Sequence, residues 1–145
     1  RFEALRKAMK AAGIPFQKDF VAECDHTLEG GARGMASLLS LPSPPTAVLC
    51  CNDMAAIGAL KTLSSRGLRP GRDISLIGFD DLSLCLFTQP SLSTIRFSPR
   101  EIANLAFRML MENIQVPEAK IDYEYKTQFV LRESTGAPKS HRGTN

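Results

Sequence analysis

The chain has 145 residues, of which 43% are hydrophobic and 23% are charged, and its formal net charge is +3. This composition is typical of one soluble globular domain with a sizeable core. The small charge does not favour nucleic-acid or membrane-surface binding, and no apolar run approaches the roughly 20 residues of a membrane span. Because residue 1 is Arg and a helical pattern follows at once, we expect the native N-terminus to lie upstream.

The first half of the chain alternates between helical and strand patterns. Apolar residues at helical spacing, and then short apolar runs, predict a helix over 2–12, a strand over 20–22, a helix over 27–40 and a strand over 46–51. Gly13 provides the stop after the first helix, and Asn52 or Asp53 can cap the next one.

The second half continues the alternation. Its patterns predict a helix from 54 to Gly67, buried strands over 74–79 and 93–95, a helix from 98 to about 113 and a strand over 123–132. Ser98 at the N-cap, Pro99 at the first helical position and Glu101 two residues later form a strong helix start. The polar residues 139–145 are expected to be a flexible tail.

Strands that alternate with helices require crossover connections, so we predict an α/β fold with three layers: a mainly parallel sheet with helices on both faces. The continuous apolar runs 46–51 and 74–79 suit strands that are covered on both faces. In such a sheet, ligands bind at the carboxyl ends of the strands, which share one edge.

Few polar groups follow the predicted strands at that edge. They are Asp25 and His26, Asn52 and Asp53, Asp80 and Asp81, and Arg96 with the aromatic Phe97. Carboxylates and amides hydrogen-bond hydroxyl groups, and a ring offers an apolar platform. The edge therefore suits a sugar or another small polyol-like or heterocyclic ligand.

Simpler interpretations stay open for each of these residues. Asn52, Asp53 and Asp81 can act as helix caps only, because Asn and Asp are favoured there for backbone reasons. His26 can be a loop histidine without a role, and Phe97 can belong to the core. The ligand site rests on the convergence of these residues.

The sequence gives little support for metal binding, cofactors or catalysis. The four cysteines, Cys24, Cys50, Cys51 and Cys85, form no C-x-x-C motif, and only two histidines are present. We expect no zinc site and free thiols in a reducing cytosol. There is also no nucleophile elbow, dinucleotide fingerprint or P-loop, so we expect no cofactor and no enzyme activity.

Four stretches resemble the effector-binding core of LacI/GalR-type transcription regulators. They are FEALRKAMKAAGIP (2–15), PTAVLCCNDMAAIGALKTLSSRGLRPGRDISLIGFDD (45–81), PSLSTIRFSPREIANLAFRML (90–110) and LRESTG (131–136). The resemblance implies a fold like that of periplasmic binding proteins, with a small effector, often a sugar, in a cleft between two lobes. Residues 1–138 match the second lobe.

The same resemblance implies a cytoplasmic regulator that reaches operator DNA only through a helix-turn-helix domain upstream of this chain. A periplasmic sugar-binding protein of an ABC transporter, with the same fold, is the alternative. The four cysteines and the doubled acid after the strand lean away from it.

By position, Asp80 resembles the family's cleft aspartate, and Asn52 resembles the polar group of its Asn-Asp motif. His26 falls where many members place an aromatic residue that stacks on the ligand. Phe97 falls where a polar residue such as Gln is common. The arginine that grips the effector in the family is expected just before Arg1.

In the family, the segment 97–122 packs on the first lobe. The helix over 100–113 is apolar on nearly every face, so its exposure would favour association. We therefore expect a homodimer, with exchange of this helix between protomers as one arrangement.

Overall fold

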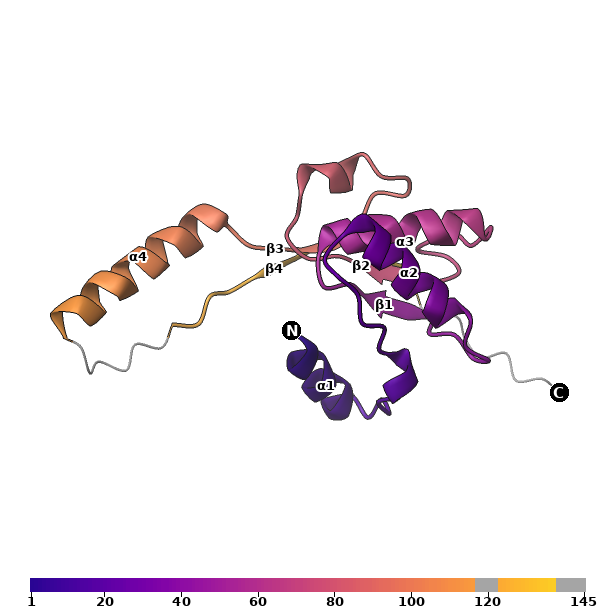
Figure 1. The fold of residues 1–145 in the computed structure, drawn as a ribbon, viewed down its shortest axis with the longest axis horizontal. Helices are drawn as coiled ribbons and strands as arrows, with labels where there is room; N and C mark the ends of the chain where they lie inside the picture. Colours follow the sequence, from indigo (N-terminus) through magenta and orange to yellow (C-terminus); the bar gives the residue numbers. More distant parts are fainter. Residues whose placement is uncertain (117–122, 138–145) are drawn as a thin grey trace.

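The computed structural model describes residues 1–116 and 123–137 (Figure 1). Its elements, in chain order, are α1 (Phe2–Ala11), η1 (Lys18–Phe20), α2 (Leu28–Leu39), β1 (Ala47–Leu49), α3 (Asp53–Ser65), β2 (Ser75–Ile77), η2 (Ser83–Leu86), β3 (Thr94–Arg96), α4 (Pro99–Gln115) and β4 (Gln128–Val130). The predicted tail over 139–145 lies outside the described residues, as does the 117–122 part of the segment 97–122.

The strands form two two-stranded sheets, β1-β2 and β3-β4, which isolated parallel bridges connect. β1 and β2 pair in parallel, and single bridges such as Ile77 to Ser93 extend this parallel arrangement to β3. β3 then pairs antiparallel with β4, the strand that returns from α4. The predicted α/β fold with a mainly parallel sheet is confirmed.

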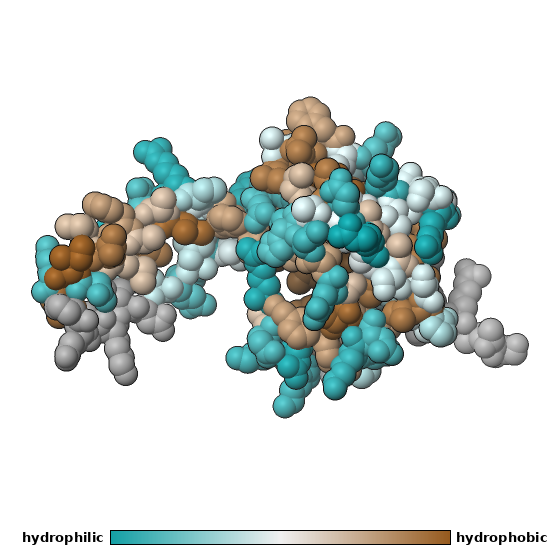
Figure 2. Space-filling view, in the orientation of Figure 1, coloured by the Kyte–Doolittle hydropathy of each residue, from teal (hydrophilic) through white to brown (hydrophobic). Residues whose placement is uncertain are grey.

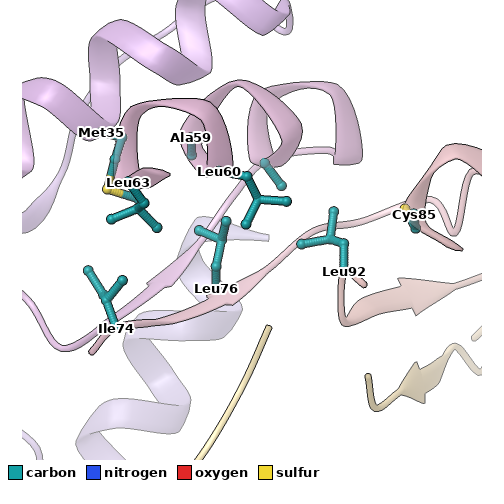
Figure 3. Packing of buried hydrophobic residues seen from close by; sticks show 9 residues of the cluster. Met35, Ala59, Leu60, Leu63, Ile74, Leu76, Cys85 and Leu92 are labelled. Atoms are coloured by element: carbon teal, nitrogen blue, oxygen red, sulfur yellow. The ribbon is translucent and has the colours of Figure 1, made fainter. Parts of the chain in front are cut away.

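Helices lie on both sides of the sheet. α2 and α3 cover one face, and α1 lies on the opposite side of β1 and β2 (Figure 1). The core forms between α2, α3 and the sheet, where apolar side chains at helical spacing meet those of the strands (Figure 3); it includes Met35, Leu60, Leu63, Ile74, Leu76 and Leu92. α1 contributes no buried residue.

Two glycines allow α2 and α3 to approach closely. A Cβ atom on Gly31 would lie 1.9 Å from the Ala55 carbonyl oxygen, and one on Gly58 would lie 1.8 Å from the Leu28 carbonyl oxygen. Any side chain at either position would separate the helices. The segments that enter α2 and α3 are therefore held side by side.

Two details of the sheet differ from the sequence-based expectation. The predicted strand over 20–22 is wrong: η1 ends at Phe20, and Val21 is extended but belongs to no strand among the described residues. An extended segment becomes a strand only when a neighbour supplies ladder hydrogen bonds. β1 is also covered less than predicted, since Leu49 keeps 37% of its surface exposed while Leu76 in β2 is fully buried.

α4 projects away from the rest of the chain (Figure 1), and none of its 17 residues is buried. Its predicted start is confirmed, because the Ser98 hydroxyl accepts the Glu101 N–H at 3.2 Å. The Tyr125 hydroxyl accepts the Ser98 N–H at 3.0 Å and donates to the Glu101 carboxylate at 2.8 Å. The helix is thus fixed at its first turn and exposes apolar side chains along its length (Figure 2).

Candidate functional site

Asp80 lies at the carboxyl end of β2 in a strained turn. Its φ is 125° and that of Asp81 is 58°, both in the region that favours glycine. Such conformations cost on the order of 1–3 kcal/mol each and persist only where the surroundings enforce them. The backbone N–H of Asp80 donates to the Ile95 carbonyl at 3.0 Å. Within the described part of the chain, its carboxylate has no hydrogen-bond partner.

The groups around Asp80 determine the pKa of its carboxyl group. Burial raises the pKa of its carboxyl group above the usual value, and the neighbouring Asp53 carboxylate adds to this. Arg1 and His26 act in the opposite direction but do not cancel the effect. Titratable groups from three separate segments therefore lie close to this carboxylate, which has no hydrogen-bond partner among residues 1–116 and 123–137.

Arg1, which the sequence analysis did not single out, lies at the rim, by which we mean the edge around Asp80 at the carboxyl ends of the strands. Its guanidinium donates to the Cys51 carbonyl at 2.6 Å and lies 3.8 Å above the centre of the Phe79 ring. The effector-gripping arginine was expected just before this position, but Arg1 itself reaches the rim. No local pattern indicates this role, because the contact joins residues 50 positions apart.

Asn52 joins two of the loops at the rim. Its Oδ1 accepts the Ala55 N–H at 2.9 Å, which confirms it as the N-cap of α3. Its Nδ2 donates to the His26 carbonyl at 3.0 Å. Because an amide nitrogen carries two hydrogens, Asn52 keeps one donor for a ligand.

His26 and Phe97 lie at the same rim with different degrees of exposure. His26 is exposed, and Phe97 is half-buried rather than part of the core. The Phe97 ring packs against Phe79, with 5.7 Å between ring centres and 40° between planes. The pair forms an apolar platform beside Asp80, with Arg1 above its Phe79 half.

Asp53 stabilises the segments that form the rim. Its carboxylate is fully buried and accepts the Thr94 hydroxyl at 2.6 Å and the Leu82 N–H at 2.8 Å. The cap of α3 is its neighbour Asn52, so Asp53 is not a cap. It joins the start of α3 to β3 and to the loop that follows Asp80.

Asp81 does not cap a helix, so this expectation was wrong; the N-cap position of η2 is Leu82. The Asp81 carboxylate instead accepts hydrogen bonds from Arg132, at 2.6 Å, and from Arg96. Burial alone would raise the pKa of Asp81, but the two arginines outweigh it and hold this pKa below its usual value. The φ of Asp81, 58°, also lies far from the negative values of a right-handed helix.

Asp25 and Arg96 also follow predicted strands, but their side chains bond to other residues of the protein rather than contribute to the rim. Asp25 accepts the Thr27 hydroxyl at 2.6 Å and pairs with Arg33 at 3.2 Å, at the start of α2. Arg96 pairs with Asp81.

Two surface grooves of the described residues lie apart from the rim. A groove beside α1, lined by residues 3–16, and another lined by residues 64–70, 89–90 and 133 contain none of the rim residues. Among residues 1–116 and 123–137, no three His, Cys, Asp or Glu side chains are grouped to hold a metal ion. None of the helices in the described part of the chain could cross a membrane.

Comparisons with known proteins identify relatives over nearly the whole chain. A periplasmic binding protein-like domain model matches residues 1–135. The "Probable HTH-type transcriptional repressor ExuR" of Bacillus subtilis (strain 168) is 37% identical over 135 residues, which are 92% of this chain and 40% of the repressor. The chain thus spans about 40% of that relative's length.

Two solved structures share the fold of the chain. A LacI family transcriptional regulator from Enterococcus faecium, with bound ribose, superposes with a TM-score of 0.78 at 27% identity, over 95% of this chain and 51% of that one. A complex of the transcriptional regulator CelR with cellobiose superposes with a TM-score of 0.80 at 25% identity, over 89% of this chain and 40% of that one.

Proposed function

Since the chain belongs to the periplasmic binding protein-like family, among the LacI-family transcriptional regulators, we propose that it is the second lobe of an effector-sensing domain. One observation carries the proposal. The Asp80 carboxylate, which has no hydrogen-bond partner among the residues that the structure describes, lies where Arg1, His26, Asn52 and Phe97 converge from separate segments. We propose that these five residues bind a small molecule.

The chemistry of this rim favours a sugar. The Asp80 carboxylate can accept hydrogen bonds from hydroxyl groups, and Arg1 and Asn52 can donate to them. Phe97 and Phe79 offer an apolar surface for the C–H face of a pyranose or furanose ring. The relatives in complex with ribose and cellobiose support this choice of effector class.

The regulatory role follows from differential binding. An effector that contacts two lobes stabilises one angle between them, and this bias is transmitted to the DNA-binding heads. We propose that the operator is bound by a helix-turn-helix domain outside this chain, in a cytoplasmic protein that catalyses no reaction. A transporter-associated periplasmic binding protein is the alternative, and the repressor relatives do not favour it.

Two exposed apolar surfaces support the association of this lobe with partners. We propose that α4, within the segment 97–122, packs on the first lobe of the complete protein. In the isolated chain, α4 is free to pack on a second copy, with helix exchange as one arrangement. Leu84 and Leu86 of η2 and the adjacent Phe87 are 51%, 60% and 82% exposed, and we assign this segment to a homodimer contact.

A thermal-shift screen of sugars and nucleobases on the full-length protein tests the proposed function. A sugar should raise the melting temperature, because a ligand that binds only the folded state stabilises it. If only nucleobases do so, the effector class is wrong; if no compound does so, the rim is not a binding site for either class.

A further inference from the structure

Two contacts restrain the side chain of Arg1. Its Cζ atom lies 3.8 Å from the centre of the Phe79 ring, and its Nη1 donates to the Cys51 carbonyl at 2.6 Å. Arg1 is exposed, whereas Phe79 is half-buried. An exposed arginine otherwise samples many rotamers, and the ring and the carbonyl, which come from separate segments, limit this freedom.

The Phe79 ring is itself held by its surroundings. The Phe79 carbonyl accepts the Asp53 N–H at 2.8 Å, which joins the segment after β2 to the start of α3. The ring packs against Phe97, with 5.7 Å between ring centres. Phe79 also directly precedes Asp80 in the sequence. The ring is therefore a fixed base for the guanidinium, next to the proposed ligand group.

Arg1 lies near Asp80 but does not pair with it. Burial raises the pKa of the Asp80 carboxyl group, and Arg1 is near enough to act against this effect. Among residues 1–116 and 123–137, however, no ion pair joins the two side chains. A guanidinium carries five N–H donors, of which Cys51 accepts one. The carboxylate of Asp80 and the remaining donors of Arg1 can thus bind different hydroxyl groups of one ligand.

We propose that Phe79 is a positioning residue, which holds the Arg1 guanidinium in the orientation that the effector requires. The inference rests on the proposed function of the rim. It adds a role exerted through Arg1 to the apolar surface that Phe79 shares with Phe97. A planar guanidinium stacks on an aromatic face and is attracted to it. Because Arg1 is ordered before the effector arrives, binding does not have to immobilise it, and the affinity is higher.

Calorimetric titration of the full-length protein, with the sugar that gives the largest thermal shift, measures this role. Phe79→Leu keeps an apolar side chain but removes the aromatic face, and we expect it to weaken binding about threefold to tenfold. Phe79→Tyr keeps the face and should bind as the wild type does. In the Arg1→Ala protein, Phe79→Leu should have no further effect, because no guanidinium remains to be positioned.

Phe97→Leu is the matched control, because it makes the same exchange in the neighbouring ring. The Arg1 guanidinium lies over the ring of Phe79. The loss of affinity that Phe97→Leu causes should therefore be the same in the wild type and in the Arg1→Ala protein. An equal coupling of both phenylalanines to Arg1 would show that the effect does not come from the guanidinium contact.

Nuclear magnetic resonance of the chain without ligand tests the contact itself. Protons above the face of an aromatic ring resonate upfield, so the side-chain protons of Arg1 should be shifted upfield in the wild type. This shift should be lost in Phe79→Leu and kept in Phe79→Tyr. A change in general stability would not move it selectively.

An unchanged affinity in Phe79→Leu would overturn the inference. So would an equal loss with and without the Arg1 guanidinium, or an Arg1 resonance that Phe79→Leu does not shift. If the wild type binds a sugar and Asp80→Asn weakens that binding, these results overturn the positioning role alone. If no sugar binds the wild type, the proposed function fails, and the positioning role fails with it.

Discussion

The Thr94 hydroxyl donates a 2.6 Å hydrogen bond to Asp53, a carboxylate with no exposed surface. The second oxygen of this carboxylate accepts the Leu82 N–H at 2.8 Å. One buried group thereby connects α3, β3 and the loop that leaves β2. Asp80 lies in that loop, so the position of the proposed ligand group depends on Asp53.

Asp53→Ala should therefore lower the free energy of unfolding by about 3 kcal/mol, because it leaves the buried Thr94 hydroxyl and the part-buried Leu82 N–H without an acceptor. Urea denaturation of the chain measures this change. Asp19→Ala, at an exposed position in η1, is the matched control and should leave the midpoint unchanged. A loss below about 1 kcal/mol for Asp53→Ala would mean that water replaces the carboxylate.

Asp80→Gly should stabilise the protein while it removes ligand binding. Glycine adopts a φ of 125° without steric strain, and it also removes a carboxylate whose pKa is raised by burial. The relief of about 1–3 kcal/mol exceeds the entropic cost of about 0.5–1 kcal/mol for a glycine. We expect a net gain of about 1 kcal/mol in urea denaturation. A net loss would show that the strain is not present in solution.

Arg132→Ala should destabilise the protein far more than Arg96→Ala. The side chains of Arg132 and Asp81 are 11% and 10% exposed, whereas that of Arg96 is 50% exposed. Removing one partner of a buried ion pair costs about 3–5 kcal/mol, and removing an exposed partner costs about 0–1 kcal/mol. Equal losses in denaturation experiments would contradict this assignment.

The ion pair between Arg132 and Asp81 should also make the free energy of unfolding depend on pH in the acid range. The pKa of Asp81 is lower in the folded state than in the unfolded chain, so its stabilisation is complete above the unfolded value of about 4. It is lost as the pH falls through the folded value. The wild-type free energy of unfolding should therefore fall as the pH drops below about 5, and it should fall less in Arg132→Ala. Parallel curves for the two proteins would exclude this origin.

The apolar surfaces of α4 and η2 predict self-association of the chain. Phe107 on α4 is 63% exposed and Phe87 next to η2 is 82% exposed. Sedimentation velocity should detect oligomers that Phe107→Glu and Phe87→Glu weaken, each at its own contact. Lys61→Glu, at an exposed position on α3, is the control for added negative charge. A monomer at high concentration would argue against both contacts.

Periodicity and turn residues were sufficient to predict most elements, because local signals such as Ser98 and Asn52 act within a few residues. The predicted strand over 20–22 failed because strand pairing depends on neighbours that a local pattern does not reveal. The prediction that Asp81 caps a helix failed for a similar reason, because its partner Arg132 is 51 residues away in the sequence. The contribution of Arg1 to the rim also depends on a long-range contact, with the carbonyl of Cys51.

The central claim, that the effector binds at the rim around Asp80, is tested most directly by calorimetric titration of the full-length protein with the sugar that gives the largest thermal shift, with ribose and cellobiose included. Asp80→Asn should weaken binding at least tenfold, since a charge-assisted hydrogen bond contributes about 1.5–3 kcal/mol. Asp19→Asn should bind as the wild type does. Equal affinity of Asp80→Asn and wild type would contradict the proposed position of the site.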